Sequence, residues 1–108
     1  RNYTTEFFGD YDLLLSPSLA VPAFKIGEQP EEIDGKRVPH RLWGFTPFTY
    51  LFNLTGNPAA SVPAGFSSTG LPIGLQIIGD MKDEVTVFAA SAALEEARPW
   101  ADKRPPVS

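Results

Sequence analysis

The sequence contains no cysteine, only one histidine (His40) and no long uninterrupted apolar run. Without cysteine the chain forms neither disulfides nor thiolate metal sites, and a single histidine cannot build a His-rich metal centre. The apolar run from Val85 to Leu94 is broken by Thr86 and Ser91 and falls well short of the roughly 18 residues that a membrane helix needs. We therefore expect no metal site and no membrane span, and a reducing compartment, the cytoplasm.

Basic residues are few and scattered. Nine Lys and Arg against 13 Asp and Glu give a net charge of -4, and no basic cluster exceeds two neighbours. A nucleic-acid-binding surface needs clustered basic residues, so we expect no nucleic-acid partner. The length of 108 residues and the hydrophobic content of 43% suit a single domain with a modest core.

Catalytic and cofactor-binding motifs are also missing. Gly35-Lys36 lacks the rest of a phosphate-binding loop, no G-x-G-x-x-G occurs, and the acidic residues between 28 and 34 match no calcium loop. No serine stands in a G-x-S-x-G or S-x-x-K pattern, and His40 reads as a surface residue without an identifiable partner. We expect no catalytic residue and no cofactor within this chain.

The first half of the chain combines short apolar segments with a long proline-rich stretch. Residues 3–8 suit the end of a helix that stops at Gly9, and 12–15 a short strand. Three consecutive leucines in that strand predict cover on both faces, as in a parallel or mixed sheet packed between helices. Prolines and charges between 16 and 41 indicate an irregular excursion, with 25–41 as a surface loop.

The second half predicts a helix, a hairpin and a second helix. Thr46-Pro47 is a good start for a helix to Leu54 that stops near Gly56, and its large apolar side chains indicate burial on several sides. Residues 60–66 and 73–78 read as strands joined across the loop 67–70, with Pro63 at an edge or a bulge.

Within the second strand we expect Ile73, Leu75 and Ile77 to face the core, and a neighbouring backbone to approach Gly74 on the other face. Asp83 is placed to cap a last helix from 84 to about 98. For that helix we predict an apolar stripe at the spacing i, i+3, i+4 and i+7, formed by Val85, Phe88, Ala89 and Ala92.

Three stretches resemble the amidase signature family of serine amidohydrolases. They are YDLLLSPS at 11–18, FTYLFNLTGNPAASVP at 48–63 followed by GLPIGLQ at 70–76, and ARPWAD at 97–102 followed by RPP at 104–106. The resemblance implies an α/β fold in which a mixed sheet is flanked by helices on both sides. It also implies that residues 1–108 form one segment, the C-terminal portion of an amidase domain.

The resemblance places the family's Ser-Ser-Lys triad upstream of the matched residues. This segment would then supply sheet strands, a packing helix and part of an acyl-pocket wall. The position of Thr46 is an aspartate in the family's glutamine-specific branch, so threonine argues against that branch. Trp43, Thr46, Pro47 and Tyr50 are our candidate substrate-binding residues, and they would suit an apolar or aromatic amide. Core filling between helix and sheet is the competing interpretation.

Two functional hypotheses follow. The first is the C-terminal part of a serine amidase that hydrolyses a carboxylic amide and is inert when isolated. Its partners would be the remainder of the amidase chain and a small-molecule amide, with homo-oligomer formation left open. The second is a non-catalytic packing or interaction module derived from the same scaffold.

Overall fold

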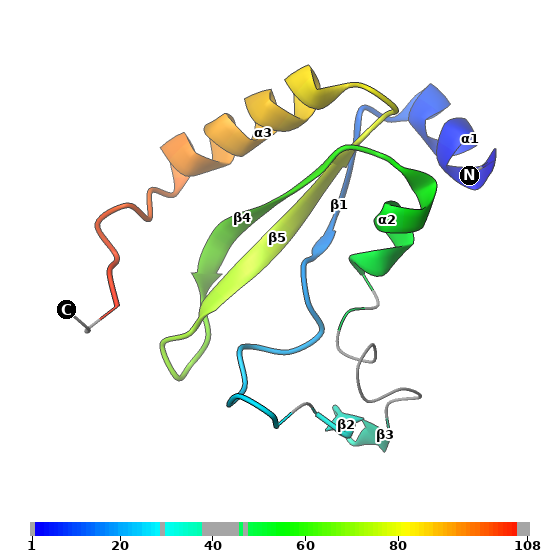
Figure 1. The fold of residues 1–108 in the computed structure, drawn as a ribbon. Coiled ribbons are helices and arrows are strands. Elements are labelled where there is room, and N and C mark those ends of the chain that lie inside the picture. Colours follow the sequence, from blue (N-terminus) through cyan, green and yellow to red (C-terminus); the bar gives the residue numbers. More distant parts are fainter. Residues whose placement is uncertain (1, 29, 38–45, 47, 106–108) are drawn as a thin grey trace.

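The computed structural model describes residues 2–28, 30–37, 46 and 48–105 (Figure 1). Along the chain the elements are α1 (Asn2–Asp10), β1 (Leu13–Pro17), β2 (Glu32–Ile33), β3 (Lys36–Arg37), α2 (Tyr50–Thr55), β4 (Ala59–Phe66), β5 (Pro72–Gly79) and α3 (Glu84–Ala97). β1, β5 and β4 form an antiparallel sheet in that order, and β2 and β3 pair as a separate short ladder. The predicted α/β organisation, a sheet with helices on both sides, is confirmed, and every strand pairing among the described residues is antiparallel where a parallel or mixed sheet was predicted.

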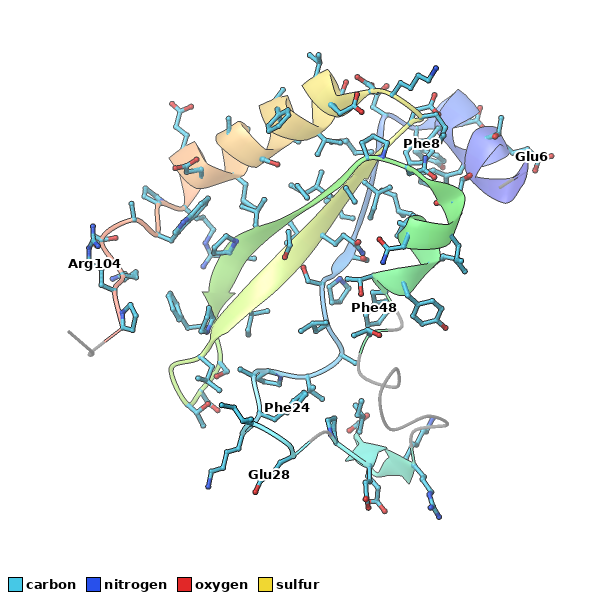
Figure 2. All side chains as sticks on the ribbon, in the orientation of Figure 1. Glu6, Phe8, Phe24, Glu28, Phe48 and Arg104 are labelled. Atoms are coloured by element: carbon cyan, nitrogen blue, oxygen red, sulfur yellow. The ribbon has the colours of Figure 1, made fainter. Side chains whose placement is uncertain are left out.

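The core is divided between the two faces of β5. Ile77 packs with Val62 and Val87 beneath α3, whereas Ile78 packs with Phe8 of α1 and Phe52 of α2. Figure 2 shows Phe8 between α1 and the strands. Adjacent residues of a strand point to opposite faces, so consecutive isoleucines serve two separate clusters.

The prediction that one face of β5 forms the core was therefore incomplete. Burial is decided by position along the strand: Gln76, Ile77 and Ile78 are buried at one end, while Ile73 at the other end is 43% exposed. The helices cover only the buried end of the sheet, which is why alternation does not continue toward Ile73.

β1 is also less covered than its three leucines predicted. It lies at an edge of the described sheet, and Leu15 is 56% exposed. The strand runs from Leu13 to Pro17, one to two residues later than expected, as strand boundaries commonly do.

The hairpin of β4 and β5 is confirmed. Pro63 lies on an edge strand next to a register shift between Pro63 and Gly65. The strand pairing is irregular at this point, so the sheet tolerates a proline, which has no N–H to donate. In the loop, the Ser67 hydroxyl accepts the Leu71 N–H at 3.1 Å, and Gly70 adopts φ +85°, a conformation that favours glycine.

The cap of α3 is confirmed, but its predicted buried stripe is wrong. Asp83 accepts the Thr86 N–H at 3.2 Å and the Thr86 hydroxyl at 2.6 Å. The buried face instead carries Val87, with Ala90 and Leu94 packed beside it. The four residues predicted for the stripe, Val85, Phe88, Ala89 and Ala92, are all exposed.

α3 turns its Val87 side toward the sheet because the helix lies very close to the end of β5. A side chain at Gly79 would stand 2.7 Å from Val87 Cγ2 and 3.2 Å from the Asp83 carbonyl oxygen. The absence of a Cβ at Gly79 lets α3 pack closely there, and that contact selects the Val87 side of the helix.

α2 begins later than the sequence predicted. It starts at Tyr50, and Thr49 at its N-cap makes no side-chain capping bond. Gly56 ends the helix as expected, with φ +80° and its N–H donated to the Phe52 carbonyl. Leu51 and Leu54 are 47% and 80% exposed, so within the described residues α2 is buried on one side and not on several.

α1 spans Asn2–Asp10 and ends one residue after the predicted stop at Gly9. Helical hydrogen bonding continues past Gly9, since the Tyr11 N–H donates to the Phe7 carbonyl at 3.1 Å. Within the proline-rich stretch, β2 and β3 form a ladder of two residues each, a small regular element in the predicted surface loop.

No helix among the described residues is long and apolar enough to cross a membrane.

We predict that Asp83→Ala lowers the free energy of unfolding by about 1 kcal/mol, because Thr86 loses the acceptor for its N–H. Urea denaturation measures the change. Asp83→Ser should retain most of the stability, and Glu95→Ala on the exposed side of α3 should have little effect. Equal losses in all three variants would contradict a capping role.

Candidate functional site

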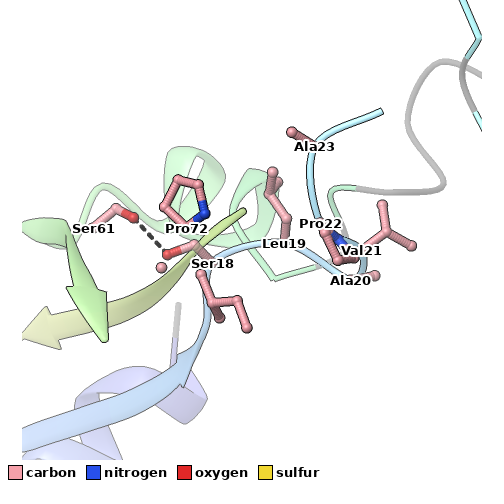
Figure 3. Close-up of a pocket in the computed structure, with 10 residues that line it drawn as sticks. Ser18, Leu19, Ala20, Val21, Pro22, Ala23, Ser61 and Pro72 are labelled. Carbon is pink, nitrogen blue, oxygen red and sulfur yellow. Dashed lines mark hydrogen bonds between the residues drawn. The ribbon is translucent and has the colours of Figure 1, made fainter. Parts of the chain in front are cut away.

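Two of the hollows beside the sheet share Ser61. The serine hollow, with a cavity volume of about 320 Å³, lies between residues 18–23 and the strands β4 and β5 (Figure 3). The Asn57 hollow, of about 270 Å³, lies between α2 and the same strands. Its polar lining consists of Thr49, Asn53, Asn57, Ser61 and Gln76, with Phe52, Ala59 and Ala60 as the apolar part.

A pair of serines stands over Gly74 in the serine hollow. The Ser18 and Ser61 hydroxyl oxygens are 2.6 Å apart, with either able to donate, and the Ser18 N–H donates to the Gly74 carbonyl at 3.0 Å. A Cβ at Gly74 would stand 2.7 Å from Ser61 Oγ and 2.8 Å from Ser18 Oγ. The predicted close approach to Gly74 is present, but two side chains make it and not a backbone.

Among the described residues, the serine pair has no neighbouring base of the kind that a nucleophile needs. Serine becomes nucleophilic when a general base takes its proton. None of the described residues that line the serine hollow is ionisable. Ser18 is 7% exposed and holds the segment after β1 against β4, which is a structural role.

Gln76 ties three elements together beside the Asn57 hollow. Its Nε2 donates to Ser16 Oγ at 2.9 Å and to the Phe48 carbonyl at 2.7 Å, and the residue is 4% exposed. The side chain thus joins β5 to β1 and to the turn before α2. A buried amide with two bonds fixes the position of these elements.

Asn57 is buried in the same hollow but only half of its amide is bonded. Its Nδ2 donates to the Gly79 carbonyl at 3.0 Å, and the residue is 8% exposed. Its Oδ1 is buried and has no hydrogen-bond partner among the described residues. No charged residue is among those that line this hollow, so its chemistry is that of neutral donors and acceptors.

The structure places two of the four candidate substrate-binding residues. Thr46 is partly buried, and its carbonyl accepts the N–H groups of Thr49 and Tyr50, each at 3.4 Å. Thr46 lines neither hollow, but its carbonyl accepts the Thr49 hydroxyl at 3.5 Å, and Thr49 lines the Asn57 hollow. Tyr50 is 44% exposed and lines neither hollow. Trp43 and Pro47, like His40, lie outside the described residues.

Sequence patterns did not single out the serine pair or Asn57. Ser18 and Ser61 are 43 positions apart, and no short motif links them. Asn57 directly follows Gly56, the glycine that ends α2. Its only local signal was an asparagine directly before Pro58, which is ordinary turn chemistry.

With this geometry established, comparison with known proteins identifies the class. The family model described as Amidase matches residues 1–88, and the chain belongs to the amidase signature family. Among solved structures, a bacterial aryl acylamidase of this family superimposes with a TM-score of 0.81 at 42% identity, covering 96% of this chain and 23% of that one. A 6-aminohexanoate cyclic dimer hydrolase gives 0.78 at 33% identity, covering 95% and 23%.

Curated relatives include an acylamidase of Rhodococcus erythropolis, 41% identical over 94% of this chain and 21% of the relative. A glutamyl-tRNA(Gln) amidotransferase subunit of Granulibacter bethesdensis is 49% identical over 85% of this chain and 17% of the relative. The chain therefore spans about a fifth of the length of these relatives.

We predict that Gly74→Ala lowers the free energy of unfolding by about 1–3 kcal/mol, because the new methyl group overlaps both serine hydroxyls. Thermal or urea unfolding measures the loss. Adding Ser18→Ala and Ser61→Ala should restore part of the stability, because both hydroxyl overlaps are removed while the contact with Ser18 Cβ at 3.1 Å remains. Gly9→Ala, where a Cβ meets nothing within 4 Å, is the matched control. A loss unchanged by the two serine substitutions would contradict the overlap.

Proposed function

We propose that this chain is part of a serine amidase that hydrolyses a carboxylic amide to an acid and ammonia or an amine. The observation that carries the proposal is the likeness to an aryl acylamidase over 96% of this chain, with a TM-score of 0.81. The acylamidase of Rhodococcus erythropolis adds support at the level of sequence. The remainder of the amidase polypeptide would be the segment's first partner.

The mechanism that fits this class begins with attack of an activated serine oxygen on the amide carbonyl carbon. The C–N bond then breaks, the nitrogen leaves with the transferred proton, and water hydrolyses the acyl-enzyme ester. The Ser18–Ser61 pair is a poor candidate for this nucleophile, because no base lies among the described residues of its hollow. In this proposal the triad comes from the polypeptide outside the present chain.

The contribution of this chain would be to the acyl side of the substrate site. Thr46 precedes α2 and contacts Thr49, which lines the Asn57 hollow. Trp43 and Pro47 neighbour Thr46 in sequence, and Tyr50 begins α2. Their side chains favour an apolar or aromatic acyl group. Threonine at 46 favours such a substrate over the glutamine used by the aspartate-bearing branch.

We predict that Thr46→Asp and Trp43→Ala, each made in the complete amidase, change the ratio of kcat/KM for aromatic over aliphatic amides. Loss of an apolar wall should lower this ratio on the order of tenfold. Rates on a matched pair such as benzamide and acetamide measure it. Substitution of Glu95, exposed on α3, is the control. Unchanged ratios in both variants would rule out the proposed acyl wall.

We also predict that the 108-residue chain alone is inert toward amides and self-associates. Leu54 on α2 and Val85 and Phe88 on α3 are 80%, 79% and 74% exposed, and exposed apolar surface of this kind promotes association. Light scattering and ammonia release measure the two properties. A monomer that hydrolyses amides would place the catalytic residues within this chain.

A further inference from the structure

The two edges of the three-stranded sheet differ in how they are protected. β1 and β4 lie on either side of β5 (Figure 1). An exposed edge strand invites pairing with another strand, and proteins protect such edges with proline, bulges or charged side chains. β4 carries Pro63 and a register shift beside it. β1 has the sequence LLLSP, with no charged residue, a continuous register and its only proline at the last position.

The register of β1 shows which of its backbone groups face away from β5. In an antiparallel pair, alternate residues direct both their N–H and their C=O toward the neighbouring strand. Ser18, directly after β1, donates its N–H to the Gly74 carbonyl at 3.0 Å, so the even-numbered residues of β1 face β5. The N–H and C=O groups of Leu13 and Leu15 therefore face outward.

The opposite side of β5 gives the same result. Gly79 donates its N–H to the carbonyl of Pro58, directly before β4, at 3.0 Å, so Gly79 faces β4. Its register partner on β1 is Leu13, which therefore faces away from β5. The same rule directs the missing N–H of Pro63 to the outer edge of β4, because its register partner Gly74 faces β1.

The outward groups of β1 form a short open segment. β5 is the one strand that pairs with β1 among the described residues, and Leu15 is 56% exposed. Pro17 has no N–H, and its carbonyl accepts the Ser16 hydroxyl at 3.0 Å, so the open segment is Leu13 to Leu15. A helix uses its N–H and C=O groups internally, whereas an extended chain presents them at the spacing of a strand edge.

We propose that the outer edge of β1, the main-chain groups of Leu13 and Leu15, pairs with an extended segment of the amidase polypeptide outside these 108 residues. The occupant rests on the proposed function, in which this chain is part of a longer amidase. The curated relatives, of which this chain spans about a fifth, have polypeptide to supply such a strand. A second copy is the competing occupant, but a five-residue strand buries far less than the roughly 1,000 Å² of a stable interface.

Amide hydrogen exchange in the complete amidase tests the pairing. NMR on protein grown with ¹⁵N-labelled leucine reads the three amides of β1, and Leu14 is the internal reference because its N–H faces β5. A paired outer edge should leave Leu13 and Leu15 within about tenfold of the exchange rate of Leu14. Faster exchange than this limit would show an open edge and overturn the proposal. Protection that disappears on dilution would assign the edge to a second copy and also overturn it.

A variant separates a bonded strand from cover by side chains alone. Leu15→Pro removes an outward N–H and leaves the N–H groups that face β5 in place, so the Leu13 amide should exchange about tenfold or more faster. Leu15→Val, which retains the N–H, is the matched control. If Leu15→Pro fails to fold, the α-hydroxy analogue of leucine at position 15 removes the same N–H and keeps the side chain. An unchanged Leu13 rate would mean that no strand is bonded there and would overturn the proposal.

The exchange measurement is separable from catalysis. Ammonia release from a simple amide such as benzamide, followed on the same protein, reports on the proposed amidase activity. Hydrolysis with an open β1 edge would retain the proposed function and remove the partner strand. A protected edge without hydrolysis would retain the partner strand and count against the proposed function.

Discussion

The structure depends on the alternation of side chains along β5. Ile77 and Ile78 are the two most completely buried large side chains, and they point to opposite faces of the central strand. One anchors α3 through Val87, and the other anchors α1 and α2 through Phe8 and Phe52. A shift of one residue in the register of β5 would exchange the two clusters.

The elements predicted best are those whose signals are local. A glycine-containing loop between two apolar runs predicted the β4–β5 hairpin. Pro63 predicted an edge or a bulge, and β4 is an edge strand with a register shift between Pro63 and Gly65. Asp83 was correctly predicted as a cap because its acceptor and the Thr86 N–H lie three residues apart. Gly56 was also correctly predicted as the end of α2, because its positive φ is a conformation that favours glycine. In each case the decisive contact lies within a few residues.

The features that could not be predicted depend on contacts between distant residues. Apolar residues occupy most sides of α3, so periodicity allowed several stripes, and the close approach at Gly79 decided for Val87. The hydrogen bonds of the candidate site could not be predicted for the same reason. The bond between Ser18 and Ser61 and the bond from Asn57 to Gly79 join positions 43 and 22 apart, which the sequence pattern does not bring together.

Gln76 and Asn57 show how two similar buried amides come to serve different ends. Gln76 directs both of its described bonds to groups of its own fold, Ser16 and the Phe48 carbonyl, and so fixes β1 and the turn before α2. Asn57 uses its donor on Gly79, and its acceptor is left over. Buried polar atoms are nearly always paired, so the unpaired Asn57 Oδ1 is an exception among the described residues and carries a cost of about 1–3 kcal/mol.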